Sequence, residues 1–498
     1  MPRATGTLET TFTASREHFE ALVGFLGGQA SAQLTHAQLE EHLAVAGREL
    51  TRLLQQDHVD LRAAREERLE EVAEADGTIH TRVERGHTRG VATIFGEIEV
   101  ARLAYRAPWS TNLYPADAIL SLPVEKYSFG LRRLTALEAG RGSFEQTTAA
   151  IERATGVRLG RRQVSELIVR AAVDIDDFYA TRELPDDPDA QVLALSLDAK
   201  GIVVRPEALR PATAKAATSR KLATRLSKGE KRNRKRMAEV GAVYQVVPAP
   251  RTPADIMPTL AGQATGRAPG PRTVGKWLTA SVTADASEVV TAVFDEAERR
   301  DPDHDRTWIA LVDGNNHQID QITAQATARG IDLTIIVDFI HVLEYLWKAA
   351  WCFHPHGDPA AEAWVADKAR EVLSGNAGLV AAAIRRTATR RQLTDDQRAG
   401  ADTAADYLHH KKRYLDYPTA LEQGWPIATG VIEGACRHLV KDRMDITGAR
   451  WGLDSAEAVL KLRALASNGD FDAYWTYHQE QERLRVHNTR YWNNIIPM

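Results

Sequence analysis

The sequence predicts a multidomain α+β protein with an N-terminal helical region, a mixed α/β core and a late all-α insertion. Apolar residues recur at helical spacing through most of residues 1–182. Short apolar, strand-like runs then alternate with helical segments over 190–342, and no strand-like run appears from 343 to 424. A length of 498 residues is consistent with about three domains.

Composition excludes several classes of protein. The net charge of -4 argues against a uniformly basic nucleic-acid coat, so any nucleic-acid surface must be a local patch. The two cysteines, Cys352 and Cys436, exclude a disulfide framework and a cysteine-rich zinc module. No apolar run approaches about 18 residues and the N-terminus has no apolar signal core, so we expect a soluble, cytoplasmic protein without a membrane partner.

The first 182 residues predict two helical regions separated by a β-hairpin. Residues 14–75 have helical spacing, including an Ala-rich, charged stretch over 61–75 that is typical of an exposed helix face, and we assign 1–88 to an N-terminal helical region. Residues 90–108 alternate around a central glycine, which predicts paired strands. The hairpin begins a second region, 89–182, which we interpret as DNA-binding.

Two helices joined by a short turn follow within 143–170. Ser143 and Gln146 have the spacing of a capping box at the start of the first helix. The second helix opens with Arg161 and Arg162, as in a helix-turn-helix whose second helix directs polar side chains toward base edges. An ordinary helical hairpin is the alternative interpretation.

After an acidic linker at 183–190, the pattern predicts one mixed sheet. The order is three strands, a helix, a strand, a helix and a strand, which we assign to the first part of a core over 190–342, with a basic insertion at 205–238. Residues 343–424 form the all-α insertion, and 425–498 supply the last part of the core with C-terminal helices. The expected strands lie in 192–204, 240–250, 276–285, 307–315 and 331–342.

Three apolar strands run into an acid, at Asp198, Asp313 and Asp338. A carboxylate at the end of a buried strand is costly to desolvate unless it meets a cation or hydrogen-bond donors, and ligands bind at strand ends in open sheets. Asp313 precedes Gly-Asn, so a plain turn is the alternative there. A late helix adds Glu433 and Arg437, four residues apart, which are either a surface ion pair or part of a metal site.

Asp, Asp and Glu together favour phosphoryl transfer. Two Mg²⁺ ions about 4 Å apart can bind the attacking and leaving oxygens, and carboxylate oxygens are the ligands that Mg²⁺ prefers. The attacker would be water or a DNA 3′-hydroxyl. The sequence has no Walker A motif, no GxSxG and no GxGxxG after a strand, so we expect no nucleotide cofactor.

The chain resembles insertion-sequence transposases of the DDE class, most closely the ISKra-type family. The segments that carry the resemblance are SLDAKGIVVRPEALR, KLATRLSKGEKRNRKRMAEVGAVYQVVPAPRTPADIM, IALVDGNNHQ, VDFIHVLEYLW and GVIEGACRHLVKDRMDITGARW. The resemblance implies an RNase H-like core with a helical insertion before the last acid. It implies Asp198, Asp313 and Glu433 as the catalytic triad and as ligands of Mg²⁺, with Mn²⁺ able to substitute.

A further part of the resemblance concerns supporting residues. Asp338-Phe339-Ile340-His341 is similar to the Asp-x-x-His signature of transposases that carry such an insertion. Asp338, His341 and Arg437 are therefore expected to support the site, with a buried core histidine as the alternative for His341.

A basic segment and one tryptophan are further candidates for DNA contact. Between Lys215 and Arg236 the chain has ten Lys or Arg residues and one acid, so this segment is expected to contact phosphates unless it is only a solvated face. Trp451 is a candidate for stacking on a base, with a core position as the alternative. The expected cationic contacts are Lys228, Lys231, Arg232, Arg234, Lys235 and Arg236.

The function predicted from these features is DNA transposition. The protein would bind terminal inverted repeats, cleave DNA by metal-activated water and join the 3′-OH to target DNA. Its partners would be double-stranded DNA and further copies of itself, at least as a dimer because two ends must be brought together, in a nucleoid-associated location. The alternatives are an RNase H-like nuclease without strand transfer and a domesticated transposase that only binds DNA.

Overall fold

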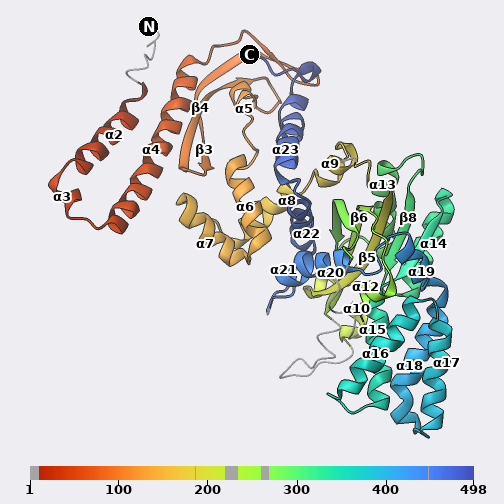
Figure 1. Ribbon diagram of the computed structural model, residues 1–498. Coiled ribbons are helices and arrows are strands. Elements are labelled where there is room, and N and C mark those ends of the chain that lie inside the picture. The colour runs from red at the N-terminus through yellow and green to blue at the C-terminus, as the bar shows by residue number, and fades with distance from the viewer. Residues whose placement is uncertain (1–10, 185–186, 219–233, 259–267, 447) are drawn as a thin grey trace, which may run out of the picture. The chain divides into compact units, whose positions relative to one another are not determined.

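A computed structural model describes residues 11–184, 187–218, 234–258, 268–446 and 448–498 (Figure 1). The chain divides into two compact units. Unit 1 comprises Met1–Thr181 with Asp470–Met498, and unit 2 comprises Arg182–Gly469. Among the described residues, no helix is both long and apolar enough to cross a bilayer.

Unit 1 contains helices and two small antiparallel sheets. The predicted hairpin is confirmed as β3 paired with β4, and it starts earlier than expected, at Arg82. The predicted helices within 14–65 and 143–170 and the capping box of Ser143 with Gln146 are also confirmed. The elements are α2 (Thr13–Leu26), α3 (Gln29–Ala32), α4 (His36–Arg65), β1 (Val72–Ala73), β2 (Ile79–His80), β3 (Arg82–Thr93), β4 (Gly96–Arg106), α5 (Pro115–Ile119), α6 (Phe129–Arg141), α7 (Phe144–Thr155), α8 (Arg161–Ala171), α9 (Ile175–Thr181) and α23 (Phe471–Val486), followed by two short turns, η5 (Asn488–Arg490) and η6 (Trp492–Asn494).

The expected helix over 61–75 is wrong in its second half. α4 ends at Arg65, and Val72–Ala73 pairs with Ile79–His80 as a short strand. Val72 is buried in a cluster with Tyr105 and Tyr491, which lie far from it in sequence. Tertiary packing therefore overrides the helical propensity of this Ala- and Glu-rich stretch.

The C-terminal helix α23 belongs to unit 1, whereas the sequence assigned 425–498 to the core. Its Tyr474 hydroxyl donates to the Ala171 carbonyl oxygen at 2.6 Å, and its His478 hydrogen-bonds Asp174 at 2.6 Å. Both acceptors lie in or just after α8. The buried side of α23 thus completes the helical part of unit 1, so the boundary of the last segment lies at Gly469.

Unit 2 is built on one five-stranded mixed sheet with the order β7-β6-β5-β8-β9. β5 pairs antiparallel with β6, and β6 with β7, whereas β5, β8 and β9 are parallel neighbours. This confirms the predicted mixed α/β core. The strands are β5 (Val192–Val203), β6 (Lys235–Val247), β7 (Arg272–Ser281), β8 (Thr307–Val312) and β9 (Leu333–Val337).

Helices cover both faces of this sheet. Gly241 of β6 faces α13, because a Cβ placed there would lie 2.4 Å from the side chain of Val293. Its cross-strand partner Leu197 shares that face, so alternation places the next residue, Asp198, on the opposite face. The helices around the strands are η1 (Pro206–Ala208), α10 (Pro211–Thr218), α12 (Pro253–Ile256), α13 (Ala286–Arg300), α14 (Asn316–Arg329) and α22 (Leu453–Asn468).

The all-α insertion is confirmed, and its helices gather beyond one end of the sheet in Figure 1. It begins with the helix that directly follows β9, and the chain then returns to the sheet face carrying Asp198. The insertion consists of α15 (Phe339–Phe353), α16 (Pro359–Leu373), α17 (Ala377–Arg390), α18 (Asp395–Lys411), η3 (Lys412–Tyr414) and α19 (Tyr417–Glu422), and the returning segment of α20 (Gly430–Ala435), the π-helical η4 (Cys436–Lys441) and α21 (Asp442–Met444).

Candidate active site at the ends of three parallel strands

Three aspartates occupy equivalent positions on the three parallel strands. Ser196 pairs with Leu311, two residues before Asp198 and Asp313 respectively. Val312 pairs with Val337, directly before Asp313 and Asp338. Continuing both registers places the three aspartates in one row, on neighbouring strands that lie roughly 4.8 Å apart. We call Asp198, Asp313 and Asp338 the aspartate row.

The first strand runs through Asp198, as the expected strand over 192–204 implied. β5 does not end at Asp198 but continues to Val203, paired with β6 alone. The parallel pairing of β5 with β8 stops at Ser196. Asp198 therefore lies at the point where β5 loses its parallel neighbour, and its main chain remains held by β6.

Asp338 is fully buried and accepts three hydrogen bonds. Its Oδ1 accepts from the Ile340 backbone N–H at 3.0 Å, which caps α15. Its Oδ2 accepts from His341 Nδ1 at 2.9 Å and from the Thr429 hydroxyl at 2.8 Å. Burial alone would raise the pKa of Asp338, but the hydrogen bonds from His341, Ile340 and Thr429 outweigh burial and lower it.

His341 and Glu433 complete a cluster around Asp338. The hydrogen bond to Asp338 raises the pKa of His341, which favours the charged imidazole. The Thr429 hydroxyl lies 3.3 Å from Glu433 Oε1 as well as 2.8 Å from Asp338, and its single proton can serve only one carboxylate at a time. One ligand atom from each of Asp338, His341 and Glu433 lies within 4.8 Å of the others. The spacing suits a divalent cation held by the Asp338 and Glu433 carboxylates, whereas the charged imidazole of His341 has no lone pair to offer a metal.

Asp198 meets the same helical segment further along. Its Oδ1 accepts from the Ala199 backbone N–H at 2.7 Å, and its carboxylate lies beside the buried thiol of Cys436. Burial, followed by the charge of Asp198, raises the pKa of Cys436 and keeps the thiol protonated. Since Glu433 lies near Asp338 and Cys436 contacts Asp198, the segment from α20 into η4 extends over the aspartate row.

Asp313 occupies the middle of the row and also forms the turn that the sequence allowed. Its Oδ1 accepts from the Asn315 backbone N–H at 2.8 Å, and Gly314 has a left-handed φ of +94°. Asn315 then caps α14 through the His317 N–H. Asp313 can thus form this turn and still belong to the aspartate row.

The predicted triad and the observed cluster overlap only partly. The observed cluster joins Glu433 to Asp338 and His341, the pair expected to support the site. Thr429 and Cys436 were not predicted. Thr429 could have been identified from the sequence, because it lies four residues before Glu433 and directly before the helix that carries Glu433.

Arg437 does not pair with Glu433. It lies in the π-helical turn that begins at Cys436, where the four-residue spacing of an α-helix no longer holds. Its Nε instead lies 3.9 Å from Asp442, and the side chain is largely exposed. Ile432, Ala435 and Leu439 of the same segment are buried.

Half of the predicted cationic contacts lie in described residues, and Lys228, Lys231 and Arg232 lie outside them. Arg234 lies directly before β6, where its carbonyl oxygen accepts from the Val204 N–H. Lys235 and Arg236 lie in β6, not in a loop. Lys235 Nζ lies 3.9 Å from Asp445. The guanidinium of Arg236 donates to three backbone carbonyl oxygens, so it has a structural role, and its contact with a phosphate stays a prediction. The three acceptors belong to Val282, Ala208 and Thr283.

Arg236 and the other cations should therefore respond differently to neutralisation. We expect Arg236→Gln to lower the stability of unit 2 by about 1–3 kcal/mol, because the three carbonyl oxygens lose their donor. Replacing Lys228, Lys231 and Arg232 by glutamine should leave the thermal midpoint unchanged. If each contacts a phosphate, the slope of log affinity against log salt falls by about 0.9 per residue. Thermal unfolding and DNA binding over a salt series separate the two effects, and an unchanged slope would contradict the phosphate contacts.

Trp451 is a core residue, so the predicted base stacking is wrong for this structure. The side chain is 5% exposed, its indole N–H donates to the Met444 carbonyl oxygen at 2.9 Å, and its backbone bridges to Val204 beside β5. The Arg443 guanidinium covers the ring at 4.7 Å from its centroid. No face of the ring is left open enough to stack on a base.

In unit 1, Arg161 and Arg162 lie at the exposed start of α8, as expected. Arg162 Nε donates to Glu166 at 2.8 Å, and the side chains of Arg162 and Glu166 are largely exposed. The helix begins after Gly160 without a side-chain cap. Their predicted contact with bases stays a prediction.

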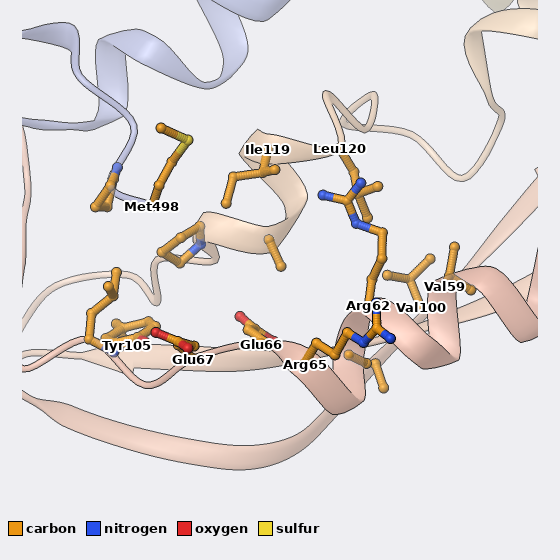
Figure 2. A pocket seen from close by; sticks show the side chains of 16 residues that line it. Val59, Arg62, Arg65, Glu66, Glu67, Val100, Tyr105, Ile119, Leu120 and Met498 are labelled. Atoms are coloured by element: carbon orange, nitrogen blue, oxygen red, sulfur yellow. Dashed lines mark hydrogen bonds between the residues drawn. The ribbon is translucent and has the colours of Figure 1, made fainter. Parts of the chain in front are cut away.

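Unit 1 also contains a cavity of about 390 Å³. Figure 2 shows it between the end of α4, β4, α5 and the last residues of the chain. Its lining is mainly apolar, with charged side chains at Arg62, Arg65, Glu66 and Glu67. Burial raises the pKa of Glu66, whose carboxylate accepts from the Leu103 N–H.

Comparisons with known proteins give little. No protein-family model matches the chain, and no curated protein matches its sequence. Among solved structures, the Drosophila P element transposase strand transfer complex is similar over 73% of this chain and 81% of that chain, with 9% sequence identity and a TM-score of 0.21. A similarity this weak supports no functional argument, and the interpretation below rests on the residues of the site.

Proposed function

We propose that the protein is a DNA transposase of the DDE class, with an RNase H-like core that cleaves DNA and joins 3′-hydroxyl ends to target DNA. The observation that carries the proposal is the aspartate row on β5, β8 and β9, with Glu433 brought over it by α20. Such an arrangement gathers acids from distant parts of the chain at one edge of a sheet, where ligands of open sheets bind.

We propose Asp198, Asp313 and Glu433 as the residues that hold two Mg²⁺ ions, which Mn²⁺ can replace. When bound, such ions activate the attacking oxygen and stabilise the leaving oxygen of an in-line displacement. Asp338 contributes by orienting Thr429, which also lies within hydrogen-bond reach of Glu433. His341 would supply a positive charge beside the acids, where it can face a DNA phosphate.

The sheet and the segment above it exclude water from one side of this site. Val240, the cross-strand partner of Asp198 in β6, is buried beside it. A carboxylate in such surroundings interacts more strongly with a cation than it would in bulk water. The partly exposed side of Asp313 and the exposed Glu433 leave the other side open to a nucleic-acid backbone.

The proposal is tested by incubating the protein with duplexes that end in the terminal repeats of its element, a target plasmid, and Mg²⁺ or Mn²⁺. A transposase produces 3′-hydroxyl ends and covalent joints to the plasmid. Cleavage without joining would instead support the nuclease alternative. Sequence-specific binding without either product would support a protein that only binds DNA.

Unit 1 is proposed to recognise the terminal repeat, through the start of α8. In the full chain, Arg161→Ala and Arg162→Ala should each reduce discrimination between the repeat and random DNA by about tenfold, the effect of losing one specific base contact. The matched control is Arg158→Ala, an exposed arginine before α8 that pairs with Glu152. It should weaken binding to all sequences equally. Unchanged discrimination in both α8 variants would contradict the assignment.

A further inference from the structure

Two tyrosines of the helical insertion reach the strand ends that carry the acids. The Tyr407 hydroxyl, from α18, donates to the backbone carbonyl oxygen of Asp313 at 3.2 Å. The Tyr417 hydroxyl, from the start of α19, donates to the carbonyl oxygen of Val337 at 2.8 Å, directly before Asp338. These contacts span 94 and 80 residues of chain. They tie the insertion to the ends of β8 and β9.

Both tyrosine rings are held in place by packing. The Tyr407 ring stacks on Tyr345 of α15, with centroids 3.8 Å apart and an angle of 12° between the rings. The Tyr417 ring is fully buried and meets Phe339 edge to face at 5.4 Å. Because the rings cannot move freely, their hydroxyls are fixed points to which the strand ends can bind with little further loss of entropy.

The loop after Asp313 is shaped around Tyr407. At Gly314, a Cβ would lie only 2.9 Å from the Tyr407 hydroxyl oxygen, and the φ of +94° disfavours any side chain. One helical turn after Tyr407, the buried Lys411 donates from Nζ to the Asn316 side chain. α18 therefore contacts the chain at Gly314, within the turn, and at Asn316, where α14 begins.

We infer that the insertion positions the acids, with Tyr407 and Tyr417 fixing the backbone at Asp313 and Asp338. The inference rests on the proposed metal-dependent function. Both tyrosines act through backbone carbonyl groups and contact neither substrate nor metal, so they are positioning residues. Without the two hydroxyls, Asp313 directly, and Glu433 through Asp338 and Thr429, would sample more orientations and bind a divalent cation less well.

The test compares Tyr407→Phe, Tyr417→Phe and the double variant in the full-length protein. Phenylalanine keeps the ring and its packing and removes only the hydroxyl. We expect each single variant to weaken Mn²⁺ binding, measured by calorimetry without DNA, by about two- to tenfold, the effect of one neutral hydrogen bond. The half-saturating Mg²⁺ concentration for DNA cleavage should rise by a similar factor. Gly314→Ala should have a larger effect.

Tyr414→Phe is the matched control. Tyr414 lies between the two tyrosines in the same segment, and its hydroxyl accepts from the neighbouring Arg413 and not from a strand end. Wild-type metal affinity in both test variants, or an equal shift in Tyr414→Phe, would overturn the inference. A wild-type protein that binds Mn²⁺ but does not cleave DNA would contradict the proposed function alone, and the binding comparison would still decide the role of the tyrosines. Absence of Mn²⁺ binding by the wild type would overturn both.

Discussion

Replacing Asp198, Asp313 or Glu433 by alanine should reduce metal-dependent DNA cleavage by about 10³-fold or more, while DNA binding stays nearly intact. Each substitution removes a proposed metal ligand, and charge stabilisation by a bound metal contributes several kcal/mol to the transition state. A loss of about 4 kcal/mol corresponds to roughly 10³-fold in rate. Asp198 and Asp313 are partly exposed and Glu433 is exposed, so removing them leaves no large cavity.

Two controls make this experiment decisive. Asp332→Ala removes an exposed acid just before β9, at the opposite end of the strand from the aspartate row, and should cleave at the wild-type rate. Asp338→Ala should lower both stability and activity, because His341 and Thr429 lose a buried acceptor. If Asp313→Ala cleaves normally and Asp338→Ala does not, the second acid is Asp338. Near wild-type cleavage by either Asp198→Ala or Glu433→Ala would remove that residue from the site.

Local patterns predicted most of the core and its acids. An apolar run that ends at a carboxylate is visible within a few residues, and the order of strands and helices predicts their layering. The strand-like residues on both sides of Asp198 also predicted that the strand continues past it, and the structure adds its pairing with β6 there. The row itself depends on the registers of β8 and β9, which no single strand specifies.

The errors have a common physical cause, which is packing between distant segments. Trp451 in an isolated sequence fragment is equally suited to a base and to a core, and the partners that decide between them are Val204 and Met444. Arg236 stands in a basic stretch of the kind that contacts phosphates, yet its guanidinium donates to neighbouring backbone carbonyl oxygens. The π-helical turn after Glu433 redirects Arg437, and a sequence of ordinary helix formers gives no sign of it.

The largest expected effect on stability is that of Arg132→Ala, in α6 of unit 1. Arg132 is fully buried, and its Nη1 donates to His478 Nε2 at 3.0 Å and to Glu482 at 3.2 Å, while Nη2 donates to Glu125. Removing one partner of a buried charge network leaves the others uncompensated and costs about 3–5 kcal/mol. Since His478 and Glu482 lie in α23, the variant should also release this helix, which urea unfolding and hydrogen exchange would both detect.

The same network predicts how pH affects unit 1. Burial lowers the pKa of His478, and the Arg132 charge adds to this, although a hydrogen bond to Asp174 opposes both. A histidine whose pKa is lower when folded than when unfolded binds more protons in the unfolded state. Its contribution to stability is therefore complete above the unfolded pKa of about 6.5. The contribution is lost as the pH falls from this value to the lower pKa of the folded state. Arg132→Ala should weaken this pH dependence.

Arg133→Ala is the matched control for Arg132→Ala, because the two residues are consecutive in one helix. The Arg133 guanidinium pairs with Asp472, whose side chain is 85% exposed, and such surface pairs contribute about 0–1 kcal/mol. Arg132→Met tests charge separately from volume, since it keeps a long side chain yet still leaves Glu482 and Glu125 without their partner. We expect unfolding free energies in the order wild type, Arg133→Ala, Arg132→Met and Arg132→Ala, from highest to lowest. Equal stabilities of Arg132→Ala and Arg133→Ala would show that α23 is held by its aromatic packing alone, and the buried charges would then have no role in joining the C-terminal helix to unit 1.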